Sequence, residues 1–251
     1  MGSAGHGSRK SVKENRGRAQ RMPTVFALHT TFATVDLLRG IFAEIMPDVR
    51  IVNVADDSLL ADVRIAGGVT PSVTRRLIGY GVLAQASGAD AIFNCCSSVG
   101  EAADLLARSV DIPVVKIDDA MASEAVQAAG RIAVMATVAT TLGPTERLLH
   151  AKASQAGKKI ETKTYLVEGA FDALMGGQKE LHDSLVLAAI ESAARENDAV
   201  VLAQGSMARL VPALSGRVNV PVFSSPRSGI EALKRALELR AKSVAAGAAS
   251  E

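Results

Sequence analysis

Two adjacent cysteines, Cys95 and Cys96, are the only thiols in this 251-residue sequence, and they lie where a reactive group is expected. They end an apolar run that is typical of a buried strand, and the segment CSSVG at residues 96–100 then begins a helical pattern. Backbone N–H groups at the start of a helix favour a negative charge and lower the pKa of a nearby thiol. The hydroxyls of Ser97 and Ser98 add donors that suit a carboxylate. A thiolate beside a bound carboxylate could move a proton at the α-carbon of that substrate.

Strand geometry decides which of the two thiols faces the site. Side chains alternate between the two faces of a strand, so at most one of the pair can point into a cleft. Because Cys96 immediately precedes the helix start, we predict that Cys96 is the reactive thiol and that Cys95 is buried and points away. The alternative is that both are core residues, since unpaired cysteine is among the most buried residue types.

The elements that must position these residues alternate between short β-rich apolar runs and longer helical patterns. Such alternation predicts a parallel sheet with helical crossovers. A proline just inside a helix is a start signal, which we assign to Pro144 and to Pro226. The predicted strands are residues 24–28, 49–54, 91–95, 113–117, 131–136, 161–167, 199–203 and 221–223, and the predicted helices are residues 34–46, 71–86, 100–109, 120–129, 144–156, 182–196, 207–214 and 227–245.

An internal repeat relates the two halves of the chain. With a shift of 108 positions, VFALHTTFAT overlies AVMATVATTL, ADAIFNCCSS overlies NDAVVLAQGS, and IPVV overlies VPVF. The second strand of each half needs a slightly different shift, and the alternative is that all α/β units look alike. From the repeat we predict an α/β fold of two pseudo-symmetric lobes, each a four-stranded parallel doubly wound sheet flanked by helices.

The repeat also sets the predicted domain boundaries. The first lobe comprises residues 23–118, the second 119–226, and residues 227–251 form a C-terminal helix with a frayed tail. This last helix could cross over to the first lobe.

Residues 1–22 hold six basic residues and one acid, and we expect a disordered basic tail. The rest is mildly acidic, which argues against a nucleic-acid partner, and no stretch has the uncharged length of a membrane span. Two adjacent cysteines exclude a disulfide framework and favour a reducing, cytoplasmic location.

Two lobes of this kind usually bind a ligand where the carboxyl ends of their strands meet. The shift of 108 makes Cys96 equivalent to Gln204 and His29 equivalent to Thr137. Each pair should lie at matching strand tips, facing one shared cleft. The loops that we expect to line this cleft are residues 29–33, 96–101, 137–141 and 204–207.

Three features together resemble a known family: the strand-end cysteine followed by small hydroxyl residues, the mirrored site in the second half, and the segment VMATVATTLGPTERLL. From Pro23 to about Leu239 the chain is similar to the aspartate/glutamate/hydantoin racemases. In that family each half supplies one cysteine, and the two work on opposite faces of an α-carbon without a metal or cofactor. The first cysteine matches Cys96, whereas the second falls at Gln204, in LAQGSM. The resemblance also implies a homo-oligomer.

Gln204 departs from the family pattern, because an amide cannot transfer a proton usefully near neutral pH. The first hypothesis is a racemase or isomerase acting at the α-carbon of a small carboxylate, with Cys96 as acid/base. The second is a single-cysteine decarboxylase or carbon–carbon lyase, in which Gln204 and the amides near Gly205 bind an enediolate or carboxylate oxygen. The third is a non-catalytic protein that binds small carboxylates. His29 is the only other nearby candidate base; otherwise it is a satisfied strand-end histidine.

Hydroxyl groups at the strand tips resemble the carboxylate-binding hydroxyls of the family, although each could instead cap a helix. Asp118 and Asp119 precede a predicted helix and have no third ligand at metal spacing, so we assign them to capping and predict no metal. Arg227 could pair with a second substrate carboxylate. No nicotinamide, flavin or P-loop pattern occurs, and we expect no cofactor. The predicted substrate-binding residues are His29, Thr30, Thr31, Ser97, Ser98, Thr137, Thr141, Gly205 and Ser206.

Overall fold

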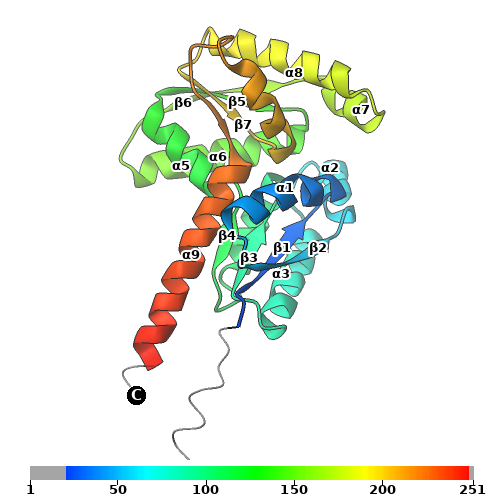
Figure 1. The fold of residues 1–251 in the computed structure, drawn as a ribbon. Coiled ribbons are helices and arrows are strands. Elements are labelled where there is room, and N and C mark those ends of the chain that lie inside the picture. The colour runs from blue at the N-terminus through cyan, green and yellow to red at the C-terminus, as the bar shows by residue number, and fades with distance from the viewer. Residues whose placement is uncertain (1–20, 249–251) are drawn as a thin grey trace, which may run out of the picture.

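The computed structural model describes residues 21–248, so the predicted tail at residues 1–22 lies almost entirely outside the described residues. The chain forms two four-stranded parallel sheets with strand orders β2-β1-β3-β4 and β6-β5-β7-β8, and helices flank each sheet (Figure 1). The predicted α/β fold of two pseudo-symmetric lobes is therefore confirmed.

The elements of the first lobe are the strands β1 (Thr24–His29), β2 (Arg50–Ala55), β3 (Ala91–Asn94) and β4 (Val114–Lys116), with the helices α1 (Phe32–Ile45), α2 (Ser58–Ala66), α3 (Pro71–Ala86), η2 (Ser97–Val99) and α4 (Gly100–Leu106). The second lobe contains β5 (Arg131–Ala136), β6 (Glu161–Leu166), β7 (Ala199–Leu202) and β8 (Val222–Ser224), with α6 (Ala139–Gln155), α7 (Ala170–Met175), α8 (Lys179–Ala194) and the 3₁₀ segment η3 (Gly205–Leu214). Two further helices, α5 (Asp119–Ala128) and α9 (Ser225–Ala248), follow β4 and β8.

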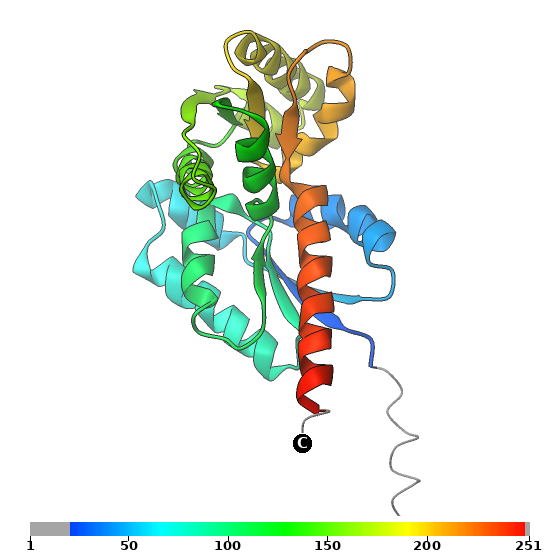
Figure 2. The same ribbon diagram turned by 90° about the vertical axis from the view of Figure 1, so that its left-hand side faces the viewer.

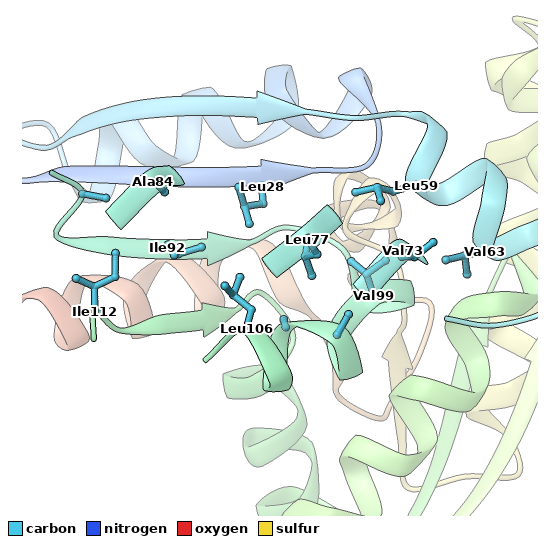
Figure 3. Close-up of a cluster of buried hydrophobic side chains, with 13 residues drawn as sticks. Leu28, Leu59, Val63, Val73, Leu77, Ala84, Ile92, Val99, Leu106 and Ile112 are labelled. Atoms are coloured by element: carbon cyan, nitrogen blue, oxygen red, sulfur yellow. The ribbon is translucent and has the colours of Figure 1, made fainter. Parts of the chain in front are cut away.

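Helices cover both faces of each sheet, which explains why the third strand of each lobe is buried along its whole length. Every residue of β3 and of β7 is buried, and a strand covered on both faces has a continuous apolar run rather than an alternating one. On one face of the first sheet, Leu28 and Ile92 pack with Leu77 and Leu106 from α3 and α4 (Figure 3). Complete burial of such a side chain contributes roughly 1.5–3 kcal/mol, so this core fixes the strand ends that carry the site.

The helices that follow β4 and β8 each cross to the other lobe. Met121 of α5 packs against Ile132 in the second sheet, and Leu233 of α9 packs against Phe93 in the first. Figures 1 and 2 show α9, in red, leaving the second lobe and running along the first. At Gly229 a β-carbon would lie 2.3 Å from the carbonyl oxygen of Ile117, so this close approach of α9 to the end of the first sheet requires glycine.

Hydrogen bonds between strands test the repeat residue by residue. The third and fourth strands of the two lobes correspond at the predicted shift of 108 positions, but the first strands correspond at 107. Leu28 accepts a hydrogen bond from Cys95 N–H, and the matching carbonyl in the second lobe is Met135, bonded to Ala203 N–H. The predicted equivalence of His29 with Thr137 is therefore wrong by one residue, because the connection between the first and third strands is one residue longer in the second lobe.

Local signals misplaced or missed several helices. The sequence predicts neither α2 nor α7, and residues 207–214 belong to a 3₁₀ segment rather than an α-helix. Pro144 lies inside α6, which begins at Ala139, whereas Pro226 does lie in the first turn of α9. The prediction that Pro144 marks the start of this helix is therefore wrong by five residues.

Candidate active site

A cavity of about 410 Å³ lies between the lobes, at the carboxyl ends of the central strands of both sheets. This is the position expected for a ligand site in a doubly wound fold. Nine of the predicted site residues line it, and His29 and Thr137 do not. The nine lining residues are Thr30, Thr31, Cys96, Ser97, Ser98, Thr141, Gln204, Gly205 and Ser206.

Cys96 lies at the tip of β3 and is partly exposed to the cavity. Its backbone is extended, and η2 begins at the next residue, so its sulfur lies beside the first free backbone amides of that segment. The thiol is within hydrogen-bonding reach of the Thr30 hydroxyl, the Ser98 hydroxyl and amide, and the Val99 amide. These donors favour the thiolate.

The pKa of the Cys96 thiol is nevertheless raised above its ordinary value. Burial is the largest cause, and the hydrogen bonds from Thr30, Ser98 and Val99 only oppose it. The predicted lowering of this pKa is therefore wrong, because the enclosed cavity removes water from the thiolate and the donors at the helix start do not fully replace it. A thiol in this state is a better proton donor than acceptor until the pH rises or a ligand changes its surroundings.

Cys95 is buried, with 5% of its surface exposed, and its pKa is raised well above the ordinary value, chiefly by burial. Its sulfur lies 3.5 Å from the Phe93 carbonyl oxygen and 3.9 Å from Nε2 of His29. The prediction of a buried Cys95 agrees with this position, but the residue still contributes to the cavity wall. Cys96 is the more accessible thiol, and it is the one that neighbouring hydroxyl and amide groups surround as hydrogen-bond donors.

The Gln204 side chain is held at one end by three hydrogen bonds. Its Oε1 accepts from Thr137 N–H at 2.5 Å, from the Thr137 hydroxyl at 3.1 Å and from Val138 N–H at 3.1 Å. Since the two backbone partners can only donate, the oxygen of the amide must face this loop. Among the described residues, no hydrogen-bond partner is found for Nε2, so its two N–H groups are available to a ligand in the cavity. Thr137, predicted to bind substrate, instead orients Gln204.

His29 is buried beneath the site rather than in it. Its Nδ1 lies 2.8 Å from the Thr34 hydroxyl and its Nε2 lies 2.9 Å from Oδ1 of Asn53. Burial lowers the pKa of His29, partly offset by the Asn53 hydrogen bond, so the ring is neutral near physiological pH. His29 is therefore a satisfied strand-end histidine and does not line the cavity, contrary to its prediction as a substrate-binding residue.

Much of the cavity wall is apolar, and the sequence patterns missed most of it. The short helix α7 contributes Phe171, Leu174 and Met175, which share one helix face because they are three and four positions apart. The sequence signal that could have identified this wall is a short apolar helix face between Gly169 and Gly176. The other large apolar lining residues are Phe32, Leu60, Ile117 and Val138.

The charged side chain predicted to meet the substrate is paired elsewhere. Arg227 bonds Glu44 at 2.6 Å on the surface, which corrects its predicted role toward a second substrate carboxylate. Asp57 is the one charged residue among the described residues that line the cavity. Arg64 of α2 stacks on the Phe171 ring, 4.5 Å from its centroid, and thereby joins the two lobes at the outer wall.

Asp118 precedes α5 but does not cap it, since its side chain makes no hydrogen bond to that helix. The carboxyl is buried, Oδ1 has no partner within residues 21–248, and burial raises its pKa against an opposing hydrogen bond from Ser97. The capping prediction is wrong for Asp118 because its side chain bonds Ser97 of η2 instead. In the same range of residues, no group of three or more His, Cys, Asp or Glu side chains could hold a metal ion, and every helix is too short or too polar to span a bilayer.

Comparison with known proteins identifies one family whose sequence pattern covers most of this chain. The sequence pattern of the family described as Asp/Glu/Hydantoin racemase matches residues 26–233. Glutamate racemase from Francisella tularensis in complex with D-glutamate is 14% identical, with 86% of this chain and 81% of that chain covered and a TM-score of 0.64. Allantoin racemase from Klebsiella pneumoniae is 20% identical, with coverage of 90% and 89% and a TM-score of 0.61.

A substituted form of arylmalonate decarboxylase, in a sulfate-associated form, is 18% identical, with 86% of this chain and 94% of that chain covered and a TM-score of 0.55. At these identities the structures share the fold alone. A sequence search of curated proteins found no match.

Proposed function

The chain belongs to the Asp/Glu/hydantoin racemase family, and we propose that it is a cofactor-independent enzyme that transfers a proton at the α-carbon of a small carboxylate. The observation that carries the proposal is the position of Cys96, at a strand tip inside a cavity between two lobes and surrounded by hydroxyl and amide donors. As a thiolate, Cys96 takes the α-proton, and as a thiol it returns one. The hydroxyls of Thr31 and Ser206 are suited to hold the substrate carboxylate, whereas the Thr141 hydroxyl already donates to the Val138 carbonyl oxygen at 2.7 Å.

We propose further that proton transfer occurs on one face of the substrate only. None of the second-lobe residues that line the cavity has a side chain that ionises near neutral pH. Gln204 therefore acts as a hydrogen-bond donor, whose Nε2 stabilises the negative charge that develops on the substrate oxygen. Donors fixed before the reaction are effective because they need no reorganisation, and one such donor is worth about 2.7–4 kcal/mol.

This asymmetry favours a second candidate, a decarboxylase or carbon–carbon lyase with a single proton donor. When the carbanion forms by loss of carbon dioxide or another carbon fragment, one acid on one face completes the reaction. Racemisation by direct proton transfer, in contrast, needs an acid/base on each face. The likeness to arylmalonate decarboxylase is compatible with this candidate, but only through the fold.

The test is solvent-deuterium incorporation over a panel of amino acids, hydantoins and substituted malonates, with chiral and mass analysis of the products. We expect exchange with retained configuration, lost in Cys96→Ala and kept in the matched Cys95→Ala variant. Release of carbon dioxide with incorporation of one deuteron would identify the decarboxylase. Efficient racemisation by the unmodified protein would contradict the proposed role of Gln204, and binding without exchange would indicate a non-catalytic carboxylate-binding protein.

We also propose a cytoplasmic location, supported by the two unpaired cysteines. A homo-oligomeric state is proposed from the family resemblance alone. Measurement of the molar mass in solution by light scattering tests the oligomeric state, and a monomer at micromolar concentration would contradict it.

A further inference from the structure

We propose that the substrate carries its negative charge only at the reacting carbon and bears an apolar alkyl or aryl substituent there, which the wall formed by α2 and α7 binds. This inference rests on the proposed function, since it concerns the ligand of the same cavity. It separates this chain from enzymes whose substrates carry a distal carboxylate, as aspartate and glutamate do.

The first argument is the apolar surface that the cavity offers. Phe171, Leu174 and Met175 present one face of α7 to it, and Leu60 of α2 and Phe32 of α1 lie on the first-lobe side. Phe32 and Met175 are 64% and 65% exposed, although most large apolar side chains of this chain are buried. Exposed apolar groups that gather at the rim of a cavity mark a site where an apolar ligand group becomes buried.

The second argument is charge. The described residues that line the cavity include no lysine, arginine or histidine, and their one charged member is the carboxylate of Asp57. A distal carboxylate would have to leave water without a cation to receive it, beside a group of the same sign, which is strongly unfavourable. The carboxylate at the reacting carbon does not meet this difficulty, because hydroxyls and the Nε2 group of Gln204 lie at the strand tips to bind it.

A cation that contacts the lining from outside is Arg64, and its contact also favours an apolar ligand. Its guanidinium stacks on the Phe171 ring at 4.5 Å from the centroid, and Phe171 lines the cavity whereas Arg64 does not. A cation in this position stiffens the wall through its contact with the ring face.

The test compares ligands that differ in charge but not in shape. An isobutyl and a carboxymethyl substituent have the same number and arrangement of non-hydrogen atoms, so leucine is compared with aspartate, isobutylhydantoin with carboxymethylhydantoin, and isobutylmalonate with carboxymethylmalonate. Binding is measured by calorimetry, and chemistry by deuterium exchange. We expect the isobutyl member to bind about 100-fold more tightly in at least one pair, since an unpaired carboxylate is costly to desolvate.

Two variants sharpen the comparison. Leu174→Arg introduces a cation into the apolar wall and should shift the preference toward the carboxymethyl member. Leu181→Arg is the matched control, because Leu181 is an exposed leucine of α8 that does not line the cavity, and it should leave the preference unchanged. Arg64→Met should leave binding of the carboxymethyl members as weak as before.

The outcomes separate this inference from the proposed function. Tighter binding of the carboxymethyl members than of the isobutyl members would overturn the inference while leaving the chemistry at Cys96 intact. A further decrease in the affinity for the carboxymethyl members in Arg64→Met would overturn it in the same way. Failure of all isobutyl members to bind would overturn it as well. Tight binding of an isobutyl member without any deuterium exchange would support the inference and contradict the proposed function.

Discussion

Replacing Gln204 by glutamate and by methionine separates the two tasks that we assign to its amide. The oxygen end accepts three hydrogen bonds from Thr137 and Val138, and the nitrogen end is free to donate to the substrate. Gln204→Glu keeps an acceptor for all three bonds and replaces the donating NH₂ by an oxygen. Gln204→Met has a similar length but neither an acceptor nor a donor.

The expected magnitudes follow from these contacts. Thr137 and Val138 are both 6% exposed, so Gln204→Met leaves two buried backbone N–H groups without a protein acceptor. Each unsatisfied buried group costs about 1–3 kcal/mol, which predicts a loss of about 2–6 kcal/mol in the free energy of unfolding. Gln204→Glu should change this free energy by less than about 1 kcal/mol, because hydrogen bonds to a carboxylate are at least as strong.

Activity should respond differently from stability. Both variants lose the donor at Nε2, so both should lose about 10²–10³-fold in the rate of α-proton exchange. Thermal unfolding and deuterium exchange, measured on the same preparations, are the two assays. In a chain of this size 1 kcal/mol corresponds to about 2–4 °C in Tm, so only Gln204→Met should show a large decrease.

Three results would refute this reasoning. Full exchange activity in the glutamate variant would mean that Nε2 does not contact the reacting group. An unchanged Tm in the methionine variant would mean that the amides of Thr137 and Val138 do not depend on Gln204, and the orientation of the side chain would lose its basis. A loss of both stability and activity in the glutamate variant would contradict the separation of the two ends.

Three further predictions follow from the structure. Because burial raises the pKa of Cys96, the exchange rate should rise with pH through and above the ordinary thiol range, and a profile already flat at neutral pH would contradict this. Gly229→Ala should destabilise the protein by about 1–3 kcal/mol in denaturant unfolding, since the new β-carbon would lie 2.3 Å from the Ile117 oxygen, whereas Gly40→Ala, with no atom within 4 Å, should not. Arg209 holds the pKa of Asp183 at about 2, below the usual 3.8. The stability that this pair adds is therefore present above pH 3.8 and lost as the pH falls toward 2, so Asp183→Asn should lower Tm at pH 6 but not below pH 2.

The strand tips could be located from the sequence because they combine two independent signals. Apolar runs identify the buried strands, and the repeat aligns Cys96 with Gln204 at a shift that the observed third strands share. The same shift fails for His29, since an alignment of strand ends cannot show that one connection is a residue longer than the other. Hydrogen-bond register is a property of paired strands, and here it makes Thr30 rather than His29 the counterpart of Thr137.

The apolar half of the site could not be found in this way. The helix α7 spans only Ala170–Met175, which is too short for a periodic pattern to stand out from the surrounding chain. From the sequence alone, Phe171, Leu174 and Met175 look like ordinary core residues, and only the folded arrangement of α7 near α2 shows that they line the cavity. The thiol pKa was misjudged for a related reason: the helix start beside Cys96 is visible locally, whereas the enclosure that outweighs it is formed by both lobes together.

The two halves of the site share one contact, between a threonine after the first strand and the residue after the third strand, but the residue after the third strand differs. At the tip of the first strand in each lobe, the hydroxyl of Thr30 or Thr137 reaches the residue at the tip of the third strand. In the first lobe that residue is Cys96, which can release and accept a proton. In the second it is Gln204, whose amide oxygen accepts hydrogen bonds from Thr137 and Val138 but which cannot transfer a proton near neutral pH. Under the proposed function, this symmetrical arrangement would hold a carboxylate between the lobes while proton transfer takes place on one side only. We therefore expect the stereochemical outcome to depend on Gln204, and the substituent accepted at the α-carbon to depend on the apolar wall of α2 and α7.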